Sequence, residues 1–171
     1  NLQGKIYLIS HDTVESTMEY VQEGIIAGTL YQDPFAQGYD TVVHLYNMVA
    51  AHQPPRQARM IIKNEMITPE NIHQFWVKGK GLIETAEREQ RLAKIIPTHL
   101  PHPITIVVLG REEVAFWDAV REGVKAAGEV LKPYNVKVEW IVPEENRKQG
   151  RADATIYTPL FQQAVQQGAQ A

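Results

Sequence analysis

The chain has 171 residues and a mass of 19.4 kDa, enough for one full-sized domain or for portions of two. Hydrophobic residues make up 44% and charged residues 22%, as in ordinary globular proteins, which disfavours disordered, collagen-like and coiled-coil classes. The net charge is −3, and no segment is strongly basic: residues 1–76 carry 4 Lys/Arg against 8 Asp/Glu, and residues 103–171 carry 8 against 9. The charge pattern of a nucleic-acid-binding surface is therefore missing.

The absence of cysteine excludes disulfides, thiolate metal sites and a cysteine nucleophile. No apolar run approaches the ~18 residues that a membrane-spanning helix needs. The chain opens on Asn1 rather than on a methionine and a signal peptide, so we expect a portion of a longer protein. We place it in the cytoplasm, with the periplasm or another extracytoplasmic compartment as the alternative.

Residues 1–76 show a repeated strand, turn and helix pattern. Residues 5–9 and 27–31 are short β-rich runs that predict buried strands of a parallel sheet. Between them the apolar period becomes helical from Thr13, and Gly24 closes the helix. The residues predicted on the buried face of this helix are Val14, Met18 and Val21.

The pattern then continues to the end of this segment. A second helix is predicted over residues 39–49 and a third strand over residues 59–62. Thr68-Pro69-Glu70 resembles a helix cap, because proline suits the first helical position.

Residues 77–102 differ in character and are predicted to be a connector. A loop is expected at residues 78–81 and a charge-dense helix at 84–94, followed by a stretch that three prolines punctuate. The predicted division of the chain is thus 1–76, 77–102 and 103–171.

The strand, turn and helix unit recurs after the connector. Strands are predicted at residues 104–109 and 136–142, and a final helix at 160–168. The helix between the two strands is expected to bury Trp117, Val120, Val124 and Leu131. Together these elements predict an α/β layered fold with parallel strands, whose ligands bind beyond the carboxyl ends of the strands.

Patterns of catalytic and metal sites are lacking. Neither a Walker loop nor G-x-G-x-x-G occurs, and the six histidines show no metal-ligand spacing. The run Ser10-His11-Asp12 holds the residue types of a hydrolase triad, but adjacent strand residues should face opposite sides of a sheet. We expect no catalytic residues, no metal and no cofactor.

Hydrogen-bonding side chains and aromatic rings do gather after the predicted strands. A carboxylate, an amide and a flat apolar ring are the groups that bind a sugar. The alternative is structural: Asp12 caps the next helix, Gln32 ends a strand in solvent, and the rings belong to the core. The candidate residues are Asp12, Gln32 and Asp33 after the first two strands, then Glu113, Phe116 and Trp117 after the strand at 104–109.

Residues 5–71 resemble the carboxyl-terminal third of type I periplasmic sugar-binding proteins, the ribose-binding kind, and of the sensor domains of lactose-repressor-type regulators. The run Gln-Asp-Pro-Phe-Ala-Gln-Gly-Tyr at residues 32–39 carries most of this resemblance, which covers about 70 residues. It implies doubly wound parallel sheets of the periplasmic-binding-protein type I, in Rossmann-like lobes. Residues 104–142 resemble the opening of the same fold. The segment that ends the family fold therefore comes before the segment that begins it. Tandem domains, a circular permutation and an engineered recombination of lobes would each give that order.

The resemblance also implies roles for the candidate residues. Asp12 and Gln32 match positions that bond sugar hydroxyls, and Phe116 and Trp117 match the aromatic pair that contacts the sugar ring. Glu113 stands in the adjoining ligand-facing turn, within the charged run Arg111-Glu112-Glu113. The family has small polar residues there and Asn-Pro where this chain has Val114-Ala115, so the ligand need not be a simple aldose.

These observations predict a non-catalytic sensor domain of a lactose-repressor-type regulator that binds a small polar ligand, a sugar by expectation. Its DNA contacts would come only from a domain outside this chain, it has no membrane segment, and a homodimer is a candidate assembly. The first alternative is the extracytoplasmic receptor of a sugar ABC transporter. The second is a flavodoxin-like signalling domain, supported by the acidic pair Glu112-Glu113. An adjoining helix-turn-helix would favour the regulator, and an export signal the receptor.

Overall fold

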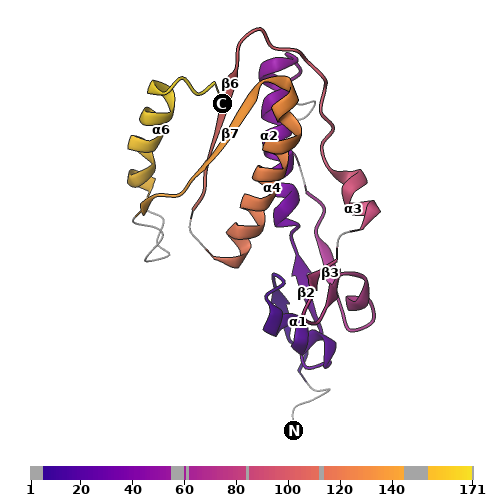
Figure 1. Ribbon diagram of the computed structural model, residues 1–171. Coiled ribbons are helices and arrows are strands. Elements are labelled where there is room, and N and C mark those ends of the chain that lie inside the picture. The colour runs from indigo at the N-terminus through magenta and orange to yellow at the C-terminus, as the bar shows by residue number, and fades with distance from the viewer. Residues whose placement is uncertain are drawn as a thin grey trace. The chain divides into compact units, whose positions relative to one another are not determined.

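The computed structural model describes residues 6–54, 60, 62–83, 85–111, 114–144 and 154–170 (Figure 1). By contacts the chain divides into two units, each with its own core. Unit 1 comprises Asn1–Asp33 and Ile61–Arg91, and unit 2 comprises Pro34–Met60 and Leu92–Ala171. The units differ from the predicted segments, because residues 34–50 fall in the predicted segment 1–76 but belong to unit 2. The predicted boundaries at 76 and 102 divide the chain by its resemblance to two family domains, and they stay a prediction.

Unit 1 is built on a three-stranded sheet in the order β1-β2-β3. β1 pairs with β2 in parallel, from Ile9 opposite Gly28 to His11 opposite Leu30, whereas β3 pairs with β2 antiparallel. The elements of unit 1 are β1 (Ile9–His11), α1 (Glu15–Gln22), β2 (Gly28–Tyr31), β3 (Glu65–Ile67), the 3₁₀ turn η1 (Ile72–Gln74), β4 (Trp76–Val77), β5 (Gly81–Leu82) and α3 (Ala86–Arg91).

The core of unit 1 forms beneath α1. Met18 and Val21 lie one turn apart on this helix and are fully buried, as predicted. Gly24 follows the helix with φ +71°, a left-handed conformation that favours glycine. The other buried residues of this core are Ile26, Tyr31, Ile67, Ile72 and Trp76.

Four expectations for unit 1 are wrong in detail. The strand predicted as buried at residues 5–9 begins only at Ile9, and the side chains of residues 6–9 are exposed, because they do not pack against the described core of unit 1. Val14 takes the N-cap position of α1 and is exposed instead of sharing its buried face. Thr68-Pro69-Glu70 starts a turn, closed by the Asn71 carboxamide accepting from the Thr68 N–H at 2.7 Å, and no α-helix.

The fourth concerns the third strand. It lies at Glu65–Ile67 rather than at 59–62, and it runs antiparallel to β2. Ile67, which is fully buried, fixes its position, whereas Met60 and Ile62 have no strand conformation; Arg59 and Ile61 lie outside the described residues.

Unit 2 is built on a parallel pair of strands, β6 and β7, aligned from Ile104 opposite Val136 to Leu109 opposite Ile141. Both strands lie within a residue of the predicted bounds. α2 and α4 lie side by side on one side of this pair, and α6 lies on the other (Figure 1). The elements of unit 2 are α2 (Pro34–Ala50), β6 (Ile104–Leu109), α4 (Ala115–Leu131), the 3₁₀ turn η2 (Lys132–Tyr134), β7 (Val136–Ile141), the 3₁₀ turn η3 (Ala154–Ile156) and α6 (Tyr157–Gln166).

The core of unit 2 joins the two long helices to the strands. α4 buries Val120, Val124 and Leu131 as predicted, whereas Trp117 is only half-buried. Two side chains of α2 form hydrogen bonds with the segment that follows α3. The Asn47 amide donates to the Lys94 carbonyl at 2.9 Å, and the Tyr46 hydroxyl donates to the Thr98 carbonyl at 3.1 Å.

The structure therefore has a mixed α/β architecture with small sheets, which confirms the coarse fold class. None of the helices in the described part of the chain combines the length and the apolar character needed to cross a bilayer.

Candidate functional site

Asp12 and Gln32 come together at one end of the unit 1 sheet. Asp12 directly follows β1, and Gln32 directly follows β2. Because the two strands are parallel neighbours, their carboxyl ends meet at the same edge. The Gln32 Nε2 donates a hydrogen bond to the Asp12 Oδ1 at 2.8 Å. Both side chains are half-buried, so the pair is still accessible to a ligand.

The backbone holds Asp12 in a left-handed conformation. Its φ is +69°, a region that non-glycine residues seldom occupy and that aspartate tolerates better than most. Its main-chain N–H donates to the Leu30 carbonyl at 2.9 Å, and its carbonyl accepts from the fully buried Thr29 hydroxyl at 2.7 Å. Since Val14 is the N-cap of α1, the alternative in which Asp12 caps that helix is wrong.

His11 also approaches this pair. Its Nδ1 lies 3.2 Å from the Asp12 Oδ1 and 3.4 Å from the Gln32 Nε2, although the imidazole is exposed. We expected adjacent residues of the run Ser10-His11-Asp12 to face opposite sides of the sheet. His11 and Asp12 approach nevertheless, because the left-handed turn at Asp12 ends the strand alternation.

A second cluster fixes the residues on either side of Gln32. The Arg88 Nη2, on α3, donates to the Tyr31 hydroxyl at 2.6 Å and lies 3.2 Å from the Asp33 Oδ1. The Tyr31 hydroxyl in turn donates to the Asp33 Oδ1 at 3.1 Å. The Arg88 and Asp33 side chains are only 14% and 13% exposed, so little solvent screens their attraction.

Burial raises the pKa of the Tyr31 phenol well above its usual value. The Asp33 carboxylate adds to this rise, and the Arg88 guanidinium opposes it. Tyr31 therefore stays neutral, and its hydroxyl accepts a hydrogen bond from Arg88 and donates one to Asp33. Sequence reasoning missed Tyr31 and Arg88; the only signal was an arginine within the charge-dense helix predicted at 84–94.

The aromatic candidates lie in unit 2. Phe116 and Trp117 stand in the first turn of α4, half-buried, with ring centroids 5.4 Å apart and planes at 86°, an edge-to-face pair. Glu113 lies outside the described residues. Asp12 and Gln32, by contrast, belong to unit 1.

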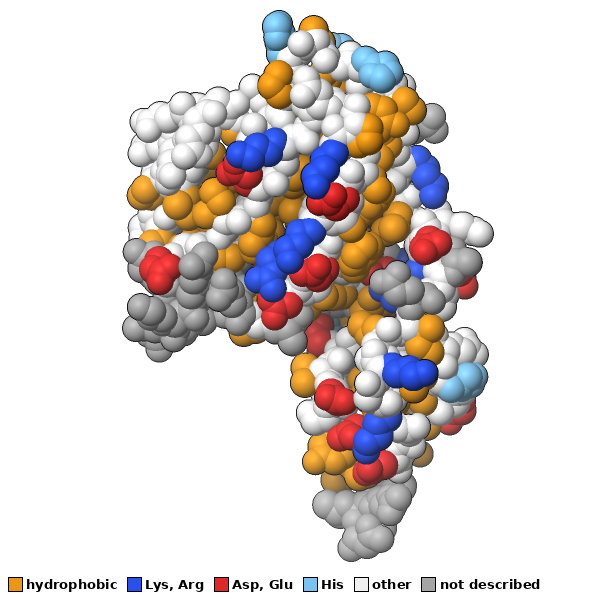
Figure 2. All heavy atoms as spheres, in the orientation of Figure 1, with side chains coloured by type: hydrophobic (Ala, Val, Ile, Leu, Met, Phe, Trp, Pro, Cys, Tyr) orange, Lys and Arg blue, Asp and Glu red, His pale blue; other side chains and the backbone are white. Residues whose placement is uncertain are grey.

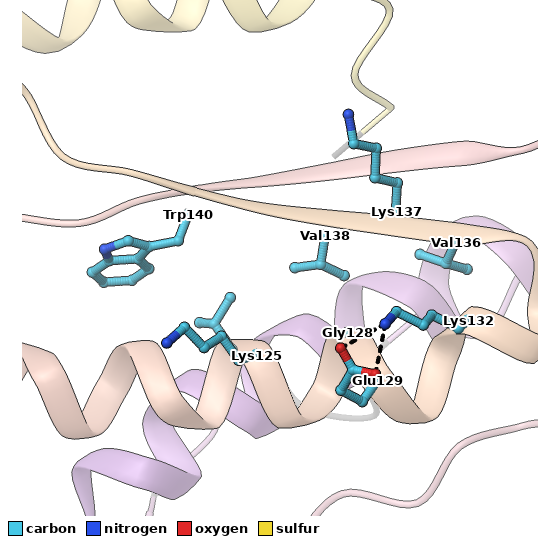
Figure 3. Close-up of a pocket in the computed structure, with 9 residues that line it drawn as sticks. Lys125, Gly128, Glu129, Lys132, Val136, Lys137, Val138 and Trp140 are labelled. Carbon is cyan, nitrogen blue, oxygen red and sulfur yellow. Dashed lines mark hydrogen bonds and ion pairs between the residues drawn. The ribbon is translucent and has the colours of Figure 1, made fainter.

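Unit 2 also carries an open groove of about 330 Å³ between α4 and β7 (Figure 3). Valine side chains and Trp140 line its floor, and charged side chains of α4 line its rim. None of the predicted site residues that the structure describes contributes to it. The lining residues are Val124, Lys125, Gly128, Glu129, Lys132, Val136, Lys137, Val138 and Trp140.

The charges on this side of unit 2 are paired. Lys and Glu side chains alternate along the exposed face of α4 (Figure 2), with Lys125 2.8 Å from Glu122 and Lys132 2.6 Å from Glu129. Lys137, the third lysine of the groove lining, lies 2.5 Å from Glu139, so each lysine of the lining has a glutamate partner. Among the described residues, no group of three or more histidine or acidic side chains could hold a metal ion.

No family model matches the chain, and the comparison with curated proteins found no match.

Proposed function

We propose that the chain is the ligand-binding portion of a sensor domain that takes a small polar ligand, a sugar, in the manner of lactose-repressor-type regulators. The hydrogen bond between Gln32 and Asp12 carries this proposal, because it gathers at one strand edge the two side chains that the family resemblance assigns to the ligand.

The chemistry of the pair suits a polyhydroxyl ligand. A carboxylate accepts several hydrogen bonds and so can bind two neighbouring hydroxyls, while an amide both donates and accepts. The bonds from Thr29 and to Leu30 hold the Asp12 backbone before any ligand arrives, which lowers the entropic cost of binding. Phe116 and Trp117, which the family resemblance assigns to the C–H face of a sugar ring, offer flat apolar surface of that kind within unit 2.

A sensor of this kind works by a population shift. Hydrogen bonds that form only when both lobes contact the ligand would favour the closed conformation, and no covalent step is required.

Calorimetric titration of the whole chain with a panel of aldoses, polyols and sugar acids tests the proposal. We expect saturable binding of at least one of them. Asp12→Asn and Gln32→Ala should then weaken binding about 10- to 100-fold each, since each removes a hydrogen bond worth ~1–3 kcal/mol to a buried hydroxyl. Asparagine also tolerates the left-handed backbone, so Asp12→Asn should fold normally.

Glu15→Ala is the matched control. Glu15 is an exposed carboxylate on the first turn of α1, three residues from Asp12, and its removal should leave the affinity unchanged. Unchanged affinity in both Asp12→Asn and Gln32→Ala would show that the ligand binds elsewhere. Circular dichroism of each variant verifies that the fold is intact.

A further inference from the structure

The outer edge of β7 has no backbone partner among the described residues. In the described part of unit 2 the sheet consists of two strands, β6 and β7. On the outer edge of β6, Gln170 pairs with the backbone of Thr105 alone: its N–H donates to the Thr105 carbonyl at 3.0 Å, and its Oε1 accepts from the Thr105 N–H at 2.8 Å. No comparable bond reaches β7 within the described ranges. An open strand edge is a template for another strand.

The ladder between the strands shows which groups face this edge. The Ile104 N–H donates to the Asn135 carbonyl, and the Gly110 N–H donates to the Ile141 carbonyl. Residues of odd number in β7 therefore direct their backbone groups to β6. Because the direction alternates along a strand, the N–H and C=O groups of Val136, Val138 and Trp140 face outward.

The side chains of β7 also alternate in character. Val136, Val138 and Trp140 face α4 and line the groove, while Lys137 projects from the opposite side of the strand (Figure 3). Lys137 and Glu139 share that second side and lie 2.5 Å apart, with the lysine side chain 70% exposed and the glutamate 30%. One face of the edge is thus apolar, and the other bears one positive and one negative charge.

We propose that two copies of this chain pair through β7, antiparallel, with Val138 opposite Val138 of the second copy. This register joins only residues whose backbone groups face outward, because Val136 then lies opposite Trp140 of the second copy. The two sheets become one sheet of four strands in the order β6-β7-β7-β6. The groove side of the junction consists of apolar cross-strand pairs.

Charge selects this register over its neighbours. Lys137 lies opposite Glu139 of the second copy, and Glu139 lies opposite Lys137, in the positions where cross-strand side chains approach most closely. Each of the four charged side chains at the junction, Lys137 and Glu139 of each copy, therefore has neighbours of opposite sign both along its own strand and across the junction. A shift of two residues one way would place lysine opposite lysine at 137, and a shift the other way would place glutamate opposite glutamate at 139. The inference does not depend on ligand binding, because it uses residues of unit 2 alone.

Sedimentation equilibrium of charge variants tests the register. Wild type should be a dimer, whereas Lys137→Glu and Glu139→Lys should each be monomeric at the same concentration, since each places like charges opposite one another. An equimolar mixture of the two variants should dimerise again, because every pair across the junction is then of opposite sign. Glu122→Lys, on the exposed face of α4 outside the groove lining, makes the same change in net charge as Glu139→Lys and should remain dimeric.

Cross-linking supplies a second, independent measurement. The chain has no cysteine, so Val138→Cys introduces a single thiol on the twofold axis. Opposed residues of this kind have Cα atoms about 5.5 Å apart, within the range that a disulfide spans. Oxidation should give a covalent dimer, while Thr105→Cys on β6 should not. A monomeric wild type, a dimer that survives Glu139→Lys, or a failure of the mixed variants to associate would each overturn the proposal.

Discussion

Arg88 reaches from α3 to both residues that flank Gln32. Its guanidinium contacts the Tyr31 hydroxyl and the Asp33 carboxylate, and its Cζ lies 5.3 Å from the centre of the Tyr31 ring. Asp33 also has a left-handed backbone, with φ +49°. This conformation is unfavourable by about 1–2 kcal/mol, which the contacts of Asp33 offset. Arg88 therefore sets the backbone on either side of a candidate ligand residue.

Replacing Arg88 should destabilise the fold strongly. Arg88→Gln leaves the Asp33 carboxylate nearly buried without its cation, which we expect to lower the free energy of unfolding by about 3 kcal/mol. Arg91→Gln is the matched control on the same helix: its partner Glu65 lies 2.7 Å away, but the arginine is 32% exposed. That change should cost less than about 1 kcal/mol. Urea unfolding measures both, and equal losses would contradict this account of the cluster.

At the scale of elements, two glycines let α2 and α4 cross closely. A Cβ on Gly123 would overlap the Phe35 carbonyl oxygen, and one on Gly38 would overlap the Val120 carbonyl oxygen. Each glycine thus faces the backbone of the other helix. The crossing joins two helices that are more than 60 residues apart in the sequence, and both contribute to the core of unit 2.

Gly123→Ala should therefore destabilise unit 2 by about 1–3 kcal/mol, because the helices must separate to admit the methyl group. Gly128→Ala serves as the control in the same helix. Its Cβ would meet only the Val138 side chain, at 3.3 Å, so the gain in helix propensity of about 1 kcal/mol offsets the tighter contact. Thermal unfolding of the two variants should differ clearly; a Gly123→Ala protein as stable as wild type would mean that the helices do not cross this closely.

At the scale of the whole molecule, the chain builds two cores that share no residue. One core contains Met18 and Ile67 in unit 1, and the other contains Val124 and Leu131 in unit 2. A loss in one core should therefore leave the other largely intact, because units with separate cores can open separately.

Large-to-small substitutions in each core test this independence. Met18→Ala and Leu131→Ala both truncate fully buried side chains and should each cost about 2–5 kcal/mol locally. Hydrogen exchange read by peptide mass spectrometry should show lost protection in unit 1 alone for Met18→Ala and in unit 2 alone for Leu131→Ala. Loss of protection throughout the chain in either variant would indicate a single cooperative unit.

Sequence patterns alone located the elements with strong apolar periodicity. β6 and β7 were predicted to within a residue, and three of the four residues predicted on the buried face of α4 are buried, because a run of β-branched residues and a 3.6-residue apolar period are local properties. The placement of Asp12 and Gln32 at one edge also followed from local reasoning, since each ends a strand and the strands are parallel. Their role in binding stays a prediction.

Only the tertiary structure decided which apolar runs are buried and which distant residues meet. Residues 6–9 have the composition of a buried strand yet are exposed, because burial depends on neighbours that the run itself does not specify. The antiparallel pairing of β3 with β2 is likewise not a local property, because the path of the chain between two strands sets their relative direction. The contact of Arg88 with Tyr31 and Asp33 spans 57 and 55 residues, a separation at which periodicity carries no information, so folding alone could reveal it.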